Sequence, residues 1–225
     1  MRSRGTDPLV LNAWLTARSI VRGLPPPVPE FGGFRVDTRS DAEIARWVFP
    51  KRGSGLESLA RSISKPGYFL KLCGTADELR AALPECWELH APAYFMRAAG
   101  KPPGRRLADG YRIEVKRAGM VLEARILSET GALAASGYAA ETPYAFIYDR
   151  IVTEPDHRRK GLGHVLMQRL HDARQHASSM ELLVATEDGR ALYSTLGWET
   201  ISPYSTASIV ERQRRAAYRD AATAV

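Results

Sequence analysis

The chain has 225 residues, of which 44% are hydrophobic and 25% are charged. These proportions are typical of globular proteins, so long disordered regions are not expected, and the length suits one large domain or one and a half small ones. No stretch approaches the ~18–20 apolar residues of a membrane span, and the polar segment 1–8 is not typical of a secretory signal. Only two cysteines are present, Cys73 and Cys86, so we expect no disulfide framework and a cytoplasmic protein.

The charge balance is basic. Lys and Arg number 32 against 25 Asp and Glu, which gives a net charge of +7. Such an excess suits a polyanionic ligand, which could be nucleic acid, a membrane surface or a phosphorylated small molecule. Basic residues cluster at 101–106, 157–160 and 212–219. We interpret the first and third clusters as solvated surface, whereas the second leads directly into a Gly-x-Gly.

The first hundred residues predict a mixed α/β region. Apolar residues recur at helical spacing from Leu9 to Val21, and the prolines at 25–27 end that helix. Segment 68–73 predicts a strand, and segment 86–96 is expected to be extended. Three capping-box patterns each predict the start of a short helix: Ser40 with Glu43, Ser54 with Glu57, and Thr75 with Glu78.

The pattern changes after residue 100. Residues 101–110 hold two prolines, two glycines and three basic residues, which predict a linker or long loop. Four runs of strand character then predict an antiparallel meander: 111–116, 120–127, 132–139 and 145–153. The remaining predicted elements are a long amphipathic helix, a short strand, a short helix and a last strand: 161–177, 181–185, 190–196 and from Trp198 onward.

Segment 152–164 has the features of a pyrophosphate site. A strand ends, Pro155 breaks it, and three basic residues lead into Gly161 and Gly163 at the start of the long helix. The N-terminus of a helix leaves about four N–H groups unpaired and carries roughly half a positive charge. Glycine lets a phosphate approach those N–H groups closely. The basic residues are Arg158, Arg159 and Lys160.

Two familiar phosphate motifs do not fit this segment. A P-loop requires Gly-Lys-Ser/Thr, whereas His164 and Val165 follow Gly163 here. A dinucleotide fingerprint requires a third glycine where Leu166 stands. The spacing Arg158-x-x-Gly161-x-Gly163 instead resembles the coenzyme A motif of the GCN5-related N-acetyltransferase (GNAT) superfamily, Arg/Gln-x-x-Gly-x-Gly/Ala.

Three further features resemble that superfamily in the same order. A meander precedes the motif, and an amphipathic helix and a short strand follow it. Then Ala191-Leu-Tyr193-Ser-Thr-Leu-Gly197-Trp198 resembles, in compressed form, the second signature Ala-x-x-Leu-Tyr-x-x-Leu-Gly-Phe. The resemblance covers about 111–210 and implies an α/β, GNAT-type acyl-CoA N-acyltransferase fold, with a mixed, largely antiparallel sheet flanked by helices. One departure is that the two helices that normally follow the first strand have no room between Tyr111 and Met120.

The resemblance implies transfer of an acetyl group from acetyl-CoA, the co-substrate, to a primary amine by direct attack. No metal is expected, because His157, His164 and His171 recur every seven residues, whereas metal-binding histidines on one helix lie four apart. It implies that backbone groups at the strand end contact the pantetheine arm: Ile151, Val152 and Thr153. It also implies a pyrophosphate site made of Arg158, Arg159, Lys160, Gly161, Leu162, Gly163 and His164. Tyr193 matches the tyrosine that protonates the leaving thiolate, a role that suits a phenol with a pKa near 10. Core packing is the alternative for Tyr193.

The acceptor amine must also lose a proton. Asp149, Glu154 or a chain of waters could take it. Asp149 could instead pair with an arginine such as Arg150, because a carboxylate on a central strand is costly unless it is paired or functional. Strict alternation would place two sets of side chains on opposite faces of this strand: Ile147, Asp149, Ile151 and Thr153 on one, and Tyr148, Arg150 and Val152 on the other.

These observations predict four parts. They are an N-terminal α/β extension or degenerate half-GNAT lid (1–100), a linker (101–110), a GNAT catalytic core (111–210) and a basic helical tail (211–225). The expected partners are acetyl-CoA and a small-molecule amine acceptor, with no membrane, and a homodimer is left open. The alternative function is a non-catalytic acyl-CoA-binding regulator. The presence of Tyr193 favours the enzyme over this alternative. Nucleic-acid binding ranks lower, because the Arg-rich tail lacks interleaved aromatic residues.

Overall fold

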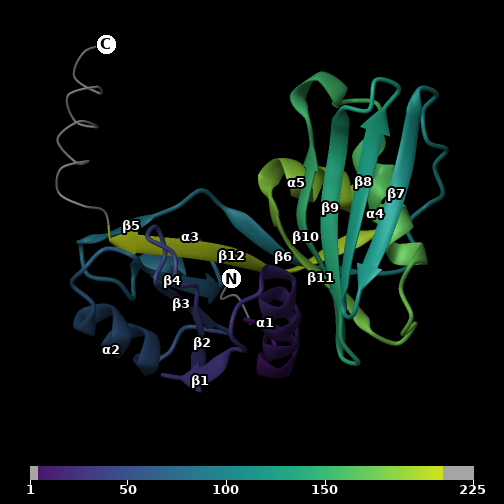
Figure 1. Cartoon of the computed structure of the whole chain (residues 1–225). Helices are drawn as coiled ribbons and strands as arrows, with labels where there is room; N and C mark the ends of the chain where they lie inside the picture. The colour runs from purple at the N-terminus through teal and green to yellow at the C-terminus, as the bar shows by residue number, and fades with distance from the viewer. Residues whose placement is uncertain (1–4, 210–225) are drawn as a thin grey trace, which may run out of the picture. The chain divides into compact units, whose positions relative to one another are not determined.

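The computed structural model describes residues 5–209, which form two compact units (Figure 1). The described part of the first unit comprises residues 5–8, 27–93 and 202–209, and the second unit comprises Leu9–Pro26 and Tyr94–Ile201. The predicted tail 211–225 lies outside the described residues, and the four-part domain organisation stays a prediction. None of the helices within residues 5–209 is long and apolar enough to cross a membrane.

The second unit is built on the predicted meander. Four strands pair antiparallel in chain order: β7 (Tyr111–Ala118), β8 (Val121–Ser128), β9 (Leu133–Glu141) and β10 (Ala145–Thr153). Beyond β10 the sheet continues with β11 (Met180–Thr186), which runs parallel to β10, and then with β6 (Ala93–Ala98). This arrangement confirms the expected mixed, largely antiparallel sheet.

Two helices bury their apolar sides against this sheet. They are α4 (Leu162–Asp172) and α5 (Glu187–Thr195), and their buried residues share one core with β8, β9 and β10. Gly137 of β9 lies in the contact between α4 and the sheet. A Cβ atom there would lie 2.4 Å from Cδ1 of Ile151 and 2.6 Å from Cδ2 of Leu166, so a larger residue would require these side-chain ends to shift. The predicted helix 161–177 is correct at its start, but α4 ends at Asp172.

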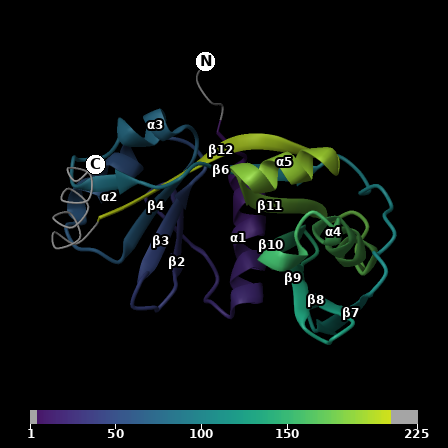
Figure 2. The ribbon, with the colours of Figure 1, turned by 90° about the horizontal axis from the view of Figure 1, so that it is seen from above.

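A helix from the N-terminal region also belongs to the second unit. It is α1 (Pro8–Arg22), and it follows the predicted apolar face closely. The ring of Trp14 lies 5.2 Å from that of Phe95 in β6, and Arg22 reaches Asp149 of β10. In Figure 2, α1 lies beside β10 on the side away from α4. The sheet around β10 therefore carries a helix on each face.

The predicted alternation along β10 is wrong after Asp149. The pairing with β9 shifts register between Asp149 and Val152, and Arg150 has a φ of 53°. Such a β-bulge adds one residue to a strand and reorients the side chains that follow. Ile151 thereby joins the core beneath α4, whereas Asp149 points to α1. The two side chains lie on opposite faces and not, as alternation predicts, on the same one.

The strands of the first unit also pair with one another. They follow the order β1 (Val28–Glu30), β2 (Gly33–Asp37), β3 (Ala45–Phe49), β4 (Tyr68–Cys73) and the later part of β12 (Trp198–Ile209), which also pairs with β5 (Trp87–Leu89). Strands β3 and β4 are parallel, and α2 (Ser54–Ser62) connects them. The short helix α3 (Ala76–Arg80) follows β4, and both helices pack on one core with these strands.

Only one of the three predicted capping boxes forms. In α3, the Glu78 N–H donates to Thr75 Oγ1 at 3.1 Å, and the Thr75 N–H donates to Glu78 Oε2 at 2.8 Å. Helix α2 exists, but Ser54 is its first residue and Gly53 its N-cap. The segment after Ser40 is not a helix but β3, all five residues of which are buried. Burial on both faces removes the polar–apolar alternation by which a strand is recognised.

The packing of α1 against the second unit is testable. Trp14 is 2% exposed, so Trp14→Ala should lower the free energy of unfolding by about 3–5 kcal/mol. The matched control is Leu9→Ala on the same helix, because Leu9 is 78% exposed and should change stability by less than about 0.5 kcal/mol. Urea unfolding followed by circular dichroism measures both variants. Equal, small effects would contradict the packing of α1 described above.

Candidate active site

The Gly-rich segment lies at the point where β10 ends and α4 begins (Figure 1). Gly161 is the N-cap of α4, with φ 74° and ψ 13°, a left-handed conformation that glycine adopts without strain. No side chain caps the helix, and the N–H of Val165 makes the first intrahelical bond, to the Gly161 carbonyl. The N–H groups of residues 162–164 therefore precede the helical ladder and are available to an anion.

The three basic residues of the motif surround this helix end. All are exposed, and none forms an ion pair with a carboxylate of the described chain. Arg158 Nε donates to the Thr153 carbonyl at 3.3 Å, and Lys160 Nζ donates to Tyr111 Oη at 2.9 Å. Their positive charge adds to that of the helix N-terminus. Exposed positive charge is therefore concentrated at this helix end.

The neighbouring strands diverge beside this segment. β10 and β11 pair at only three positions, from Ala145–Met180 to Ile147–Leu182, although β10 continues to Thr153 and β11 to Thr186. On its other side the end of β10 stays paired with β9 through Val152 and Thr153. Residues 151–153 therefore have a strand neighbour on one side only. Their backbone groups that face β11 are available to an extended ligand.

Tyr193 lies on α5, which passes beside the Gly-rich segment. The preceding residue, Leu192, has its Cδ2 atom 3.4 Å from where a Cβ atom of Gly163 would be. Tyr193 is 8% exposed, and its ring centroid lies 6.0 Å from that of Trp198. Burial raises the pKa of the Tyr193 phenol to about 12. The hydroxyl therefore carries its proton at neutral pH, which suits a proton donor and is equally compatible with a packing role.

Asp149 is held by arginines. Arg22 of α1 donates two hydrogen bonds to its carboxylate, at 2.6 and 2.8 Å, and the guanidinium groups of Arg18 and Arg150 lie within 4 Å. Burial alone would raise the pKa of Asp149, but the hydrogen bonds from Arg22 and the three positive charges outweigh it and lower the pKa. A bidentate ion pair occupies the oxygens that a general base would use. These contacts favour the ion-pair alternative for Asp149.

The sequence did not identify Arg22 or Arg18 as partners of Asp149. It suggested Arg150, whose Nε lies 3.4 Å from Oδ2 and whose guanidinium stacks 4.1 Å from the Tyr138 ring centre. The signal that could have found the others is their spacing. Arg18 and Arg22 are four residues apart, so they lie on one face of α1, which shows that they can share a partner but not which one.

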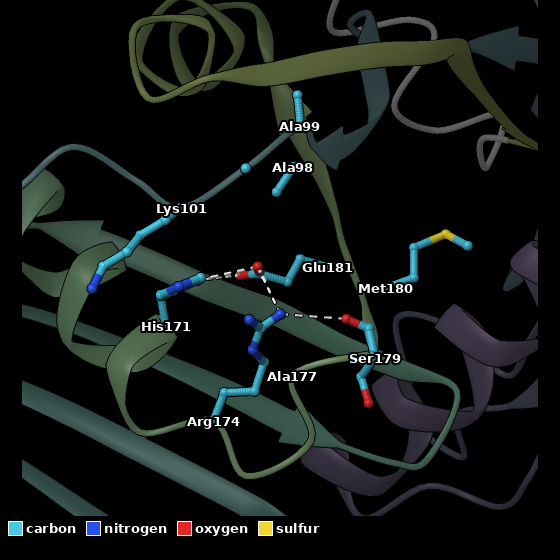
Figure 3. Close-up of a pocket in the computed structure, with 10 residues that line it drawn as sticks. Ala98, Ala99, Lys101, His171, Arg174, Ala177, Ser179, Met180 and Glu181 are labelled. Carbon is cyan, nitrogen blue, oxygen red and sulfur yellow. Dashed lines mark hydrogen bonds and ion pairs between the residues drawn. The ribbon is translucent and has the colours of Figure 1, made fainter.

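A separate cavity of about 300 Å³ lies at the other end of α4 (Figure 3). Its wall contains buried Glu181, which accepts hydrogen bonds from His171 at 3.0 Å, from Arg174 at 2.9 Å and from the Tyr148 hydroxyl. Because partners within the unit already satisfy its carboxylate, this cluster is a structural ion pair. Within residues 5–209 no group of three or more His, Cys, Asp or Glu side chains could hold a metal ion.

Comparisons with known proteins agree with this geometry. Residues 119–200 match the family model described as an acetyltransferase (GNAT) domain. No curated protein matches the sequence significantly. Several solved structures are similar to this chain, and because their sequence identities to it are low, the similarity shows the fold alone. One is a GCN5-related N-acetyltransferase from Kribbella flavida, with 11% sequence identity, a TM-score of 0.62 and a match that covers 90% of this chain and 96% of that chain. Another is a GCN5-related N-acetyltransferase from Sphaerobacter thermophilus, with 10% identity, a TM-score of 0.58 and coverage of 92% and 95% of the two chains. A tandem GNAT protein of the clavulanic acid biosynthesis pathway has 15% identity, a TM-score of 0.53 and coverage of 80% and 79% of the two chains.

The ion pair of Asp149 predicts a pH-dependent contribution to stability. Its pKa in the folded protein lies below the ordinary value of 3.8, so the contribution is full above that value and is lost as the pH falls through the folded pKa. Asp149→Asn should therefore lower the free energy of unfolding by about 3 kcal/mol at pH 7, and the gap to the wild type should close below pH 4.

The control for this prediction is Asp109→Asn. Asp109 pairs with Arg106, and both side chains are more than four-fifths exposed, so the variant should match the wild type within about 0.5 kcal/mol. Urea unfolding between pH 2.5 and 7 measures all three proteins. A gap for Asp149→Asn that stays constant over this range would contradict the ionic origin of its effect.

Proposed function

Residues 119–200 belong to the GCN5-related N-acetyltransferase superfamily, and on that premise we propose that the protein transfers the acetyl group of acetyl-CoA to a primary amine. The observation that carries the proposal is the left-handed Gly161 at the N-terminus of α4, beside the diverging ends of β10 and β11. This arrangement offers a site for a pyrophosphate and, next to it, an opening for an extended arm. A pyrophosphate and an extended arm are the two parts that distinguish acetyl-CoA from a simple phosphate.

In this proposal each part of the coenzyme has its own contacts. The N–H groups at the start of α4 and the motif's basic side chains bind the pyrophosphate. The backbone of residues 151–153, which lacks a strand neighbour on the β11 side, binds the amide-bearing pantetheine arm. The thioester then lies towards the bulge at Arg150. The bulge supports this assignment, because a non-glycine residue at positive φ is uncommon and such strain concentrates at functional sites.

The chemistry is an acyl transfer. The neutral amine attacks the thioester carbonyl, so a C–N bond forms and the C–S bond breaks. Tyr193, whose raised pKa keeps it protonated, gives its proton to the departing thiolate and regains one from solvent. The nitrogen loses its extra proton to Glu154 or to water, since the carboxylate of Asp149 is engaged by Arg22. The products are an amide and free coenzyme A, and Asp149 acts as a positioning residue for the bulge.

The alternative is an acyl-CoA-binding regulator that does not turn over. Release of free thiol from acetyl-CoA, measured against a panel of primary amines, separates the two functions. Amine-dependent release supports the transferase. Tight binding of acetyl-CoA without release for any amine class in the panel, which should span small molecules, amino acids and peptides, would favour the regulator. Absence of acetyl-CoA binding would overturn both.

The pyrophosphate site predicts the effect of a charge at Gly161. Gly161→Glu forces a side chain into the left-handed conformation and places a negative charge where the phosphate must bind. Acetyl-CoA binding should fall below detection in calorimetry. The control is Gly53→Glu, the same change at the N-cap of α2, where the added side chain meets nothing within 4 Å. A folded Gly161→Glu protein with normal affinity would remove this site assignment.

The role of Tyr193 predicts a selective loss. Tyr193→Phe should leave the Kd for acetyl-CoA unchanged but lower kcat about 10²–10⁴-fold, which is the usual contribution of a positioned proton donor. Tyr144→Phe is the matched control, because Tyr144 is 78% exposed. Steady-state kinetics with the best amine of the panel measures the effect. Unchanged kcat, under conditions where chemistry limits the rate, would leave Tyr193 as a packing residue.

A further inference from the structure

The segment before β7 runs along α4 and is fixed to it. Lys101 Nζ lies 3.3 Å from a carboxylate oxygen of Asp172, His164 Nε2 donates to the Pro103 carbonyl at 2.7 Å, and the Arg105 N–H donates to Gln168 Oε1 at 2.9 Å. Pro102 is buried, and Leu107 packs against the core of the second unit. The segment predicted as a linker or long loop is therefore held beside the helix that begins at the Gly-rich motif.

This anchoring places the side chain of Arg105 against Gly161. A Cβ atom on Gly161 would lie 2.2 Å from Arg105 Nε and 2.4 Å from Cζ, so the guanidinium occupies the space next to the N-cap of α4. Arg105 is exposed, and its guanidinium pairs with no carboxylate among residues 5–209. Its neighbour Arg106, by contrast, forms an ion pair with Asp109 at 2.8 Å.

The position of Arg105 is electrostatically unfavourable in the absence of an anion. A helix N-terminus carries partial positive charge, which favours anions and disfavours cations. The motif already contributes three cations there, so Arg105 adds a fourth like charge to the same site. An anion with at least two negative charges would convert this repulsion into attraction. A guanidinium suits phosphate in particular, because its planar N–H groups match two phosphate oxygens.

We propose that Arg105 is a further coenzyme-binding residue, which binds the pyrophosphate of acetyl-CoA from outside the Gly-rich motif. The proposal rests on the proposed function, because it assumes that acetyl-CoA is the ligand. It assigns Arg105 to the pyrophosphate and not to the 3′-phosphate, because the guanidinium lies against the N-cap glycine itself. Arg105 precedes residues 119–200, which match the family model, so the contact belongs to this chain's own preceding segment.

The test is the affinity for acetyl-CoA of three proteins, measured by calorimetry at low and high salt. Arg105→Gln should raise the Kd about 10-fold, which is the usual effect of one hydrogen bond to a charged group, and the loss should shrink at high salt. Arg106→Gln removes the same charge one residue away and should change the Kd less than 2-fold. Arg105→Lys, which keeps the charge without the planar group, should fall between the wild type and Arg105→Gln.

The same measurements with dephospho-acetyl-CoA, which lacks the 3′-phosphate, locate the contact. The ratio of Kd values between Arg105→Gln and the wild type should be the same for both ligands. A ratio that falls to one with dephospho-acetyl-CoA would overturn the assignment to the pyrophosphate. Thermal melting without ligand serves as the folding control, and Arg105→Gln should match the wild type because the side chain is exposed.

Failure of this inference and failure of the proposed function give different results. If the wild type binds acetyl-CoA and Arg105→Gln binds it as tightly as Arg106→Gln does, only the role of Arg105 is overturned. If the wild type binds no acetyl-CoA, the proposed function fails, and the assignment of Arg105 to the coenzyme fails with it.

Discussion

The site depends on the bulge at Arg150 in the middle of β10. At its start β10 pairs with both β9 and β11. The pairing with β11 ends at Ile147, and beyond the bulge the strand pairs with β9 alone. The bulge turns Ile151 into the core under α4 and leaves Asp149 facing α1. The extra residue therefore turns neighbouring side chains of β10 towards the two helices that flank the strand. The ion pair between Asp149 and Arg22 holds the strained residue between two anchored neighbours.

The two parts of the proposed site are the Gly-rich segment and α5, and both lie beside the end of β10. The strand leads directly into the Gly-rich segment, and α5 returns beside it so that Leu192 lies against Gly163. The two sequence signatures are thereby brought side by side, although 30 residues separate them along the chain. Burial keeps the Tyr193 phenol protonated at neutral pH, as the proposed proton donor requires.

Most of the second unit could be predicted from the sequence. The meander, α4, β11 and α5 follow from periodicity and turn residues, because each element buries one face and so leaves a regular pattern. The bulge could not be predicted, since nothing in the run around Arg150 marks the extra residue. The partner of Asp149 could not be predicted either, because Arg22 lies 127 positions away. Neither could Arg105, whose segment has the composition of a linker, because only the three-dimensional structure shows that its backbone is anchored to α4.

A segment of the first unit shows that a basic, Gly-rich sequence between a strand and a helix does not by itself make an anion site. Lys51-Arg52-Gly53-Ser54-Gly55 also follows a strand and begins a helix, with basic residues and two glycines in the same order. Yet a Cβ atom on Gly55 would lie 1.9 Å from the Phe31 carbonyl, so the chain itself fills the space beside that glycine. Arg52 pairs with Glu57, and β3 pairs with β4 at five positions, so the charge is neutralised and the strands stay together. The segment at Gly161 differs from it in three respects. The space beside its glycine holds the exposed side chain of Arg105 and not backbone, its basic residues pair with no carboxylate of the described chain, and the strands beside it diverge.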